Sequence, residues 1–135
     1  MIGGTHDMDE LFDITGKVSV ITGGAGILCS EMARGLGKKG SKIAILDLNE
    51  EQAKAVAEEI TSHGGTAIAV KADVLDKNSL EKARDVVLQT YGEVDILING
   101  AGGNKKEATT SDTFEFFDIP PEAIQWVFNL NLLGT

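Results

Sequence analysis

Four short runs of apolar and β-branched residues alternate along the chain with longer segments whose apolar residues recur at helical spacing. Short runs bounded by glycine are typical of buried strands, whereas a 3.6-residue spacing predicts amphipathic helices. Strands and helices in this alternation form βαβ units with parallel strands and right-handed crossovers, so the sequence predicts an α/β fold with a doubly wound sheet. The predicted strands span 17–22, 42–47, 66–71 and 94–99, and the predicted helices span 27–39, 49–62, 79–91 and the segment from Pro121 onward.

The first predicted strand runs directly into the segment Thr22-Gly23-Gly24-Ala25-Gly26, which a helix follows. Glycine lets the backbone turn tightly and approach a ligand without Cβ atoms in the way. The N–H groups and the dipole at a helix start favour a bound phosphate, and the first βα turn is where a dinucleotide fold places its pyrophosphate. A glycine-rich turn without a ligand is the alternative for this segment taken alone.

Asp47 ends the second predicted strand, 21 residues after Gly26. This spacing is near the ~20 residues that separate such a turn from the acidic residue that binds the adenosine ribose. A carboxylate there accepts hydrogen bonds from both ribose hydroxyls and repels the 2′-phosphate of NADP. Lys42 is the one nearby residue that could offset this repulsion, so we expect NAD as the cofactor, with NADP less favoured. The alternative for Asp47 is an exposed carboxylate at a strand end.

Five short motifs, in the right order on the right elements, resemble the short-chain dehydrogenase/reductase family over the stretch from Leu11 to Thr135. The resemblance implies a Rossmann-type sheet with strand order 3-2-1-4, and residues 1–135 as the N-terminal part of one NAD(P)-binding domain. It also implies a homo-oligomer, because the last helix of this stretch usually lies at a subunit interface. The motifs are 22–26, Asp47, Ala72-Asp73-Val74, Asn99-Gly100-Ala101-Gly102 and Asn131-Leu132-Leu133-Gly134.

The resemblance assigns roles by position. The glycine turn would line the diphosphate, Asp73 and Val74 would contact adenine, and the segment after the fourth strand would lie beneath the cofactor near its ribose. Asn131 matches the family's catalytic asparagine, which holds a water in a proton relay; its alternative is a helix-terminating residue. The residues expected to bind the cofactor are Thr22, Gly23, Gly24, Gly26, Ile27, Asp47, Asp73, Val74, Asn99, Gly100, Ala101 and Gly102.

The chain also departs from the family pattern. Ile27 and Cys29 stand where the family commonly has two further glycines. The segments 24–28, 99–104 and 116–131 resemble a subgroup of sugar-acid oxidoreductases of the D-mannonate type. The family's catalytic serine and Tyr-x-x-x-Lys motif are absent, since the only tyrosine, Tyr91, has no lysine four residues on. We therefore expect these residues to be the front half of a longer enzyme and to be inactive alone.

Lys105 and Lys106 follow the fourth predicted strand, at the carboxyl end of the sheet where ligands of such folds bind. One of them could meet the carboxylate of a sugar-acid substrate, and the alternative is a solvated loop.

Net charge and composition limit the classes of molecule that this chain is expected to bind. A net charge of −9 argues against nucleic-acid binding, which needs clustered Lys and Arg. No apolar run approaches the ~20 residues of a membrane span, and the N-terminus lacks the features of a secretory signal, so we expect a cytoplasmic protein with a small-molecule substrate. One cysteine and two widely separated histidines predict no metal site.

Two other functions fit parts of the pattern. An S-adenosylmethionine-dependent methyltransferase also has a glycine-rich first turn and an acidic residue after its second strand. It usually has an acidic residue before the glycines, where this chain has Thr22. A non-catalytic nucleotide-binding module is the other alternative, and it fits a chain that ends here.

Overall fold

The computed structural model describes residues 11–135, so residues 1–10 of the predicted domain lie outside the described residues. Four parallel strands form one sheet in the order β3-β2-β1-β4. This order and the alternation of strands with helices confirm the predicted doubly wound α/β fold. The elements are β1 Val18–Thr22, α2 Ile27–Lys38, β2 Lys42–Asp47, α3 Glu50–Ser62, β3 Thr66–Lys71, α4 Lys77–Tyr91, β4 Ile96–Asn99 and α5 Pro121–Phe128.

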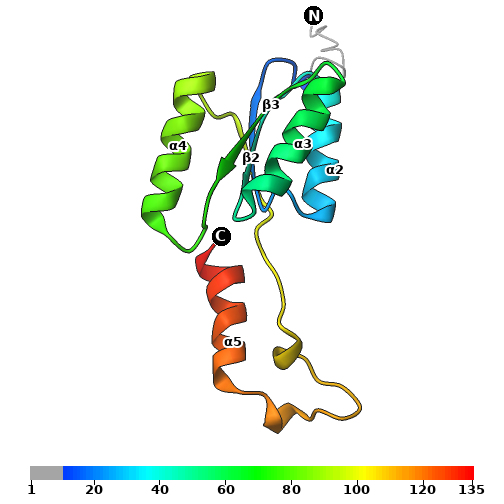
Figure 1. Ribbon diagram of the computed structural model, residues 1–135, viewed down its shortest axis with the longest axis vertical. Helices are drawn as coiled ribbons and strands as arrows, with labels where there is room; N and C mark the ends of the chain where they lie inside the picture. The colour runs from blue at the N-terminus through cyan, green and yellow to red at the C-terminus, as the bar shows by residue number, and fades with distance from the viewer. Residues whose placement is uncertain (1–10) are drawn as a thin grey trace, which may run out of the picture.

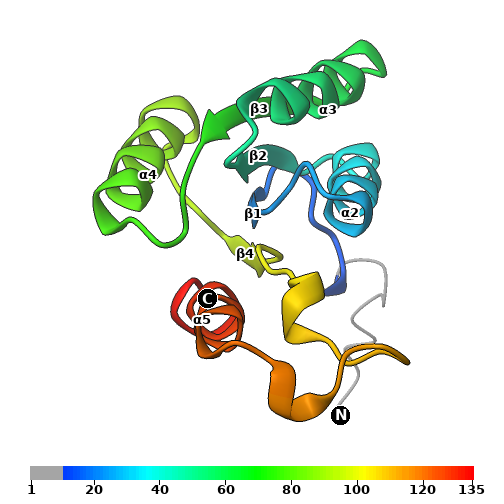
Figure 2. The same ribbon diagram turned by 60° about the horizontal axis from the view of Figure 1, so that its bottom comes forward.

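Helices cover both faces of the sheet (Figures 1 and 2): α2 and α3 lie on one face and α4 on the other. Because side chains alternate across a strand, successive residues of β1 and β2 enter two different cores. Ile21, Ile43 and Ile45 pack against α2 and α3. Val20 and Leu46 pack on the α4 side with Ala83 and Val87. Burial on both faces explains why these central strands are continuous apolar runs.

Local signals set most helix ends. The side chain of Asn49 accepts a hydrogen bond from the backbone N–H of Gln52 and so caps α3 as predicted. For α4 the predicted start at Ser79 was wrong by two residues. Asp76 caps the helix by accepting from the N–H of Asn78, and Ser79 Oγ instead accepts a bond from the N–H of Asp73.

Beyond β4 the chain leaves the sheet and forms an extension past the carboxyl ends of the strands (Figure 1). Two 3₁₀ turns, Lys106–Ala108 and Phe116–Asp118, precede α5. Pro121 occupies the first turn of α5, as the sequence predicts. The helix then widens into a π-helical segment, Asn129–Leu133, which the sequence did not predict. Within residues 11–135 no helix has both the length and the apolar character needed to cross a membrane.

Asp95 joins the start of β4 to the start of β1. Its carboxylate accepts a hydrogen bond from the Lys17 ammonium and one from the N–H of Val18, each at 2.8 Å. The bond from Lys17, and next that from Val18, lower the pKa of the Asp95 carboxyl below its ordinary value of 3.8. A carboxyl with a depressed pKa in the folded state stabilises that state fully above its unfolded pKa, and this contribution is lost as the pH falls through the folded pKa.

We therefore expect Asp95→Asn to lower the free energy of unfolding at pH 7, and this deficit relative to the wild type to shrink as the pH falls below 3.8. Denaturant unfolding of the full-length protein across this pH range measures both quantities. Asp112→Asn, at an exposed position without an ion pair among residues 11–135, is the control for the loss of one negative charge. A deficit that stays constant down to the acid limit would contradict the assignment.

Candidate functional site

The glycine turn between β1 and α2 is shaped by close backbone contacts. Gly23 has φ +60°, and a Cβ at this position would lie 2.8 Å from the carbonyl oxygen of Gly100 and from the Cα of Ala101. At Gly24 a Cβ would lie 2.8 Å from the Ile45 side chain. The turn is therefore pressed between β2 and the segment that follows β4, and glycine is required at both positions.

The amides of this turn have partners within the protein. The N–H of Gly24 donates to the carbonyl of Leu46 at 3.1 Å, and that of Gly26 donates to the carbonyl of Gly23 at 3.0 Å. The N–H groups of the first helical turn, from Ile27 onward, have no partner inside a helix. The N–H groups from Ile27 onward are thus free to donate to a phosphate beside the glycine segment. The Ile27 side chain is 87% exposed beside them.

Asp47 lies directly beside the turn. Its Oδ2 accepts a hydrogen bond from the N–H of Ala25 at 3.0 Å, and its Oδ1 accepts one from the N–H of Asn49 at 2.9 Å. A carboxylate offers about four acceptor positions, so each oxygen keeps one for a ligand. The structure therefore gives Asp47 a second task, which sequence reasoning missed: it holds the glycine turn in place.

Thr22 connects the turn to the segment 99–102. Its buried Oγ1 accepts hydrogen bonds from the N–H groups of Gly100 and Ala101, both at 3.2 Å. Gly100 also lies against Cys29, because a Cβ on Gly100 would overlap the Cys29 Sγ. These contacts fix the segment after β4 at the carboxyl end of β1, where the sequence places it.

Asp73 and Val74 form part of the loop between β3 and α4. Asp73 Oδ1 accepts a bond from the N–H of Leu75 at 2.9 Å, so the carboxylate is held by its own loop. Val74 approaches the C-terminal end of the chain, where the extension returns to the sheet (Figure 1), since a Cβ on Gly134 would lie 2.9 Å from Val74 Cγ2. The loops after β1, β2, β3 and β4 thus meet at one end of the sheet.

Asn131 lies in the π-helical segment and pairs with the backbone of Gly103. Its Oδ1 accepts from the N–H of Gly103 at 3.0 Å, and its Nδ2 donates to the Gly103 carbonyl at 2.7 Å and to the Val127 carbonyl at 2.8 Å. Widened turns of this kind are frequent at functional sites. Asn131 therefore ties the extension to Gly103, at the end of the segment that follows β4.

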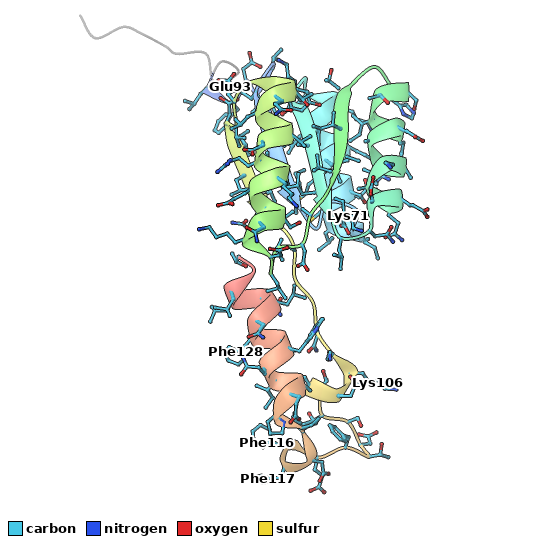
Figure 3. All side chains as sticks on the ribbon, turned by 60° about the vertical axis from the view of Figure 1, so that its left-hand side comes forward. Lys71, Glu93, Lys106, Phe116, Phe117 and Phe128 are labelled. Carbon is cyan, nitrogen blue, oxygen red and sulfur yellow. The ribbon has the colours of Figure 1, made fainter. Side chains whose placement is uncertain are left out.

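The two adjacent lysines differ in their surroundings. Lys105 is half-buried, with its Nζ 5.0 Å from the centroid of the Trp126 ring. Lys106 is exposed and points outward from the extension, away from α5 (Figure 3).

Tyr91 lies away from this site, at the C-terminal end of α4. Its hydroxyl donates a hydrogen bond to the carbonyl of Ile43 at 3.2 Å, near the start of β2. Burial raises the pKa of the Tyr91 phenol above its ordinary value. These contacts make Tyr91 a structural residue.

Three residues at the site carried no assignment from the sequence. Ala25 supplies an N–H group, which every residue except proline carries, so no sequence signal marks it. Gly103 extends the glycine-rich segment 100–102 by one residue, and this position was the only sequence feature that pointed to it. Trp126 looked like an ordinary apolar residue of α5.

Known proteins are similar to this chain in sequence. The profile of the short chain dehydrogenase family matches residues 17–135. An uncharacterized oxidoreductase of Bacillus subtilis, UxuB, is 49% identical over 130 residues, which cover 90% of this chain and 47% of the relative.

Two solved structures share the fold. A protein provisionally named D-mannonate oxidoreductase from Haemophilus influenzae, solved with bound NAD, is 39% identical with a TM-score of 0.85 over 95% of this chain and 49% of that one. A 3-ketoacyl-(acyl-carrier-protein) reductase of Brucella melitensis, solved with NADH, is 32% identical with a TM-score of 0.73 over 90% of this chain and 46% of that one.

This chain spans about half the length of the curated relatives that it matches. The family profile covers the glycine turn, Asp47 and Asn131, and it decides against the methyltransferase alternative. The chain belongs to the short chain dehydrogenase family.

Proposed function

We propose that this chain is the cofactor-binding part of an NAD-linked oxidoreductase that transfers a hydride between nicotinamide and a hydroxyl or carbonyl group of a sugar acid or related polyol. The observation that carries the proposal is the Asp47 carboxylate, which the Ala25 and Asn49 amides hold beside the glycine turn with acceptor positions left over. This negative charge suits the two hydroxyls of an unphosphorylated ribose and opposes a 2′-phosphate.

The other contacts of the cofactor follow from the same end of the sheet. The first-turn N–H groups of α2, from Ile27, would hold the pyrophosphate, where the helix dipole adds to their attraction. Asp73 and Val74 would contact adenine from the loop after β3. The segment 99–102, anchored on Thr22, would lie beneath the ribose and nicotinamide.

NAD supplies the hydride acceptor for oxidation of the substrate alcohol. The chain's own contribution near the reacting end is Asn131, which we propose to hold a water molecule in a proton relay. Its two Nδ2 bonds and its Oδ1 bond fix the amide, and Oδ1 keeps one acceptor position for that water. We propose that the family's serine, tyrosine and lysine belong to the remainder of the protein.

The substrate class rests on two supports. The neighbour that is provisionally named D-mannonate oxidoreductase matches 95% of this chain. In addition, Lys105 and Lys106 lie on the extension past the carboxyl ends of the strands, and one of these cations would meet the carboxylate of a sugar acid.

We also propose that the complete protein is a homo-oligomer that uses α5 as a contact. Ile124, Phe128 and Leu132 are spaced one helical turn apart, and they are 40%, 58% and 67% exposed. Phe128 points away from the 3₁₀ turn that contains Lys106 (Figure 3). An apolar stripe of this kind is suited to contact with another subunit.

Calorimetric titration of the full-length protein with NAD, NADP and S-adenosylmethionine tests the cofactor. We expect NAD to bind at least about tenfold more tightly than NADP, a difference of ~1.4 kcal/mol, and S-adenosylmethionine to give no binding heat. Oxidation of D-mannonate, followed by the absorbance of the reduced nicotinamide, tests the reaction. Equal affinity for the two nicotinamide cofactors, or binding of S-adenosylmethionine, would contradict the proposal.

A further inference from the structure

Lys105 and Lys106 are neighbours in the sequence, but the structure treats their ammonium groups differently. The Lys105 Nζ lies over the Trp126 ring at 5.0 Å from its centroid, within the range of a cation–π interaction. Lys106 is exposed on the outer side of the extension (Figure 3). Only one of the two cations is therefore held in a defined place by another side chain.

The backbone at Lys105 is also fixed. Asn104 Oδ1 accepts a hydrogen bond from the N–H of Lys105 at 2.9 Å, and Asn104 Nδ2 donates to Thr109 Oγ1 at 2.8 Å. The Thr109 hydroxyl in turn donates to the Lys105 carbonyl at 3.2 Å. These three bonds close a ring around Lys105, which reduces the conformational freedom that a ligand would otherwise have to remove.

The Lys105–Trp126 pair is connected to the candidate catalytic residue through Gly103. Asn131 pairs with both backbone groups of Gly103, two residues before Lys105. A Cβ on Gly103 would lie 3.7 Å from the Trp126 ring, an ordinary van der Waals distance, so the ring lies beside this glycine. The Lys105–Trp126 pair and the Asn131 contact are thus neighbours on the extension.

The ammonium of Lys105 is charged but unneutralised by its surroundings. Among residues 11–135, the ion pairs involve other cations, and Lys105 has no carboxylate partner within them. An aromatic face attracts a cation without taking up its N–H donors, so these stay available to an anion. A carboxylate is the ligand whose charge and acceptors match this group.

We propose that Lys105, and not Lys106, binds the carboxylate of the sugar-acid substrate, and that Trp126 is a positioning residue that holds the Lys105 side chain toward it. The assignment rests on the proposed function and narrows it, because a neutral polyol lacks the group that Lys105 recognises. Specificity for an acid over the corresponding alcohol is then set by one ammonium group.

The test compares three single variants, and the double variant Lys105→Met/Trp126→Leu, with the wild type of the full-length protein; Trp126→Phe is added for the fluorescence measurement. Lys105→Met keeps the length of the side chain and removes its charge, Lys106→Met is the matched control one residue away, and Trp126→Leu removes the aromatic face. The measured quantities are KM and kcat with D-mannonate, KM with the neutral polyol D-mannitol, and the Kd of NAD.

We expect Lys105→Met to raise KM for D-mannonate about 10- to 100-fold, which is the usual effect of losing one charge-assisted hydrogen bond, and to leave the Kd of NAD unchanged. KM for D-mannitol should stay unchanged, as should every quantity in Lys106→Met. Trp126→Leu should raise KM for D-mannonate, but it should have little further effect when Lys105 is already methionine. That non-additivity would not arise from a merely structural role of the ring.

Fluorescence provides a readout independent of turnover, because Trp126 is the only tryptophan of this chain. D-mannonate added to the NAD complex should change the emission of the wild type and of Lys106→Met, but not that of Lys105→Met. Trp126→Phe identifies the part of the signal that comes from this residue.

Different results would overturn the role of Lys105 and the sugar-acid substrate. If the wild type oxidises D-mannonate and Lys105→Met does so with the same KM, only the role of Lys105 is wrong. An equal loss in Lys105→Met and Lys106→Met, or an equal loss toward D-mannitol, also overturns that role. If the wild type binds NAD but neither oxidises D-mannonate nor responds to it in fluorescence, the sugar-acid substrate and the assignment of Lys105 both fail.

Discussion

Gly23→Ala is expected to weaken NAD binding strongly in the full-length protein and to destabilise its fold. Gly23 has φ +60°, a left-handed conformation that costs an L-residue about 1–2 kcal/mol. The added Cβ would also lie 2.8 Å from the carbonyl oxygen of Gly100, 2.8 Å from the Cα of Ala101 and 2.9 Å from its nitrogen. Overpacking against backbone typically costs a further ~1–3 kcal/mol.

The damage should fall on cofactor binding because the clash separates the glycine turn from the segment 100–102. These are the two surfaces that we propose to enclose the pyrophosphate and the ribose. A separation of the two surfaces removes contacts to both groups, so we expect the Kd of NAD to rise at least about 100-fold, or ~2.8 kcal/mol. Calorimetric titration with NAD and denaturant unfolding measure the two effects.

Substitutions at two other glycines separate the cost of the left-handed conformation from the cost of the steric clash. Gly64 has φ +86° with open space around it, so Gly64→Ala shows the cost of the left-handed conformation alone. Gly35 lies in α2 without positive φ and without neighbours near its Cβ position, so Gly35→Ala should stabilise the helix by about 0.5–1 kcal/mol. Normal NAD binding by Gly23→Ala, with a stability equal to that of Gly64→Ala, would contradict the close contact with Gly100.

The fold was predictable because its signals are local and repeated. Each apolar run predicts a strand and each amphipathic segment predicts a helix. The rules for βαβ units then predict how the strands and helices are arranged. The start of α4 was missed because Asp76-Lys77-Asn78 is polar and resembles a loop, although Asp76 is a good capping residue. The π-helical segment carries no such local signal, and the pairing of its Asn131 with Gly103 joins residues 28 positions apart in the sequence.

The sequence predicted which segments lie at the carboxyl end of the sheet, but not the contacts between their residues. The sequence indicates that Thr22, Asp47 and Asn131 matter, because their types and positions match a motif. Their partners in the structure are backbone groups of Ala25, Gly100 and Gly103, and a backbone group leaves no trace in the sequence. The internal bonds of the Gly24 and Gly26 amides were not predictable for the same reason.

Asp47→Asn is expected to reduce the preference for NAD over NADP about 10- to 100-fold, because it removes the charge that opposes the 2′-phosphate. The amide oxygen of asparagine can still accept one of the two bonds that now come from Ala25 and Asn49. The glycine turn should therefore keep most of its shape, so the Kd of NAD should change little. The loss of preference should come mainly from tighter binding of NADP.

Asp47→Ala separates the two tasks of this residue. It removes the charge, as Asp47→Asn does, and it also leaves the N–H of Ala25 without its partner. Both variants should lose the same discrimination between the cofactors, but Asp47→Ala should bind either cofactor more weakly, because the turn is no longer held. The difference in NAD affinity between the two variants measures the contribution of the turn contact.

Asp73→Asn is the control for the loss of a negative charge at the same end of the sheet. Adenine is common to both cofactors, so this variant should change the Kd of NAD and of NADP by the same factor. If Asp47→Asn kept the wild-type ratio of the two Kd values, the carboxylate would have no part in reading the ribose. Its bonds to Ala25 and Asn49 would then account for Asp47 completely, and the choice of cofactor would have to be made by a group elsewhere in the protein.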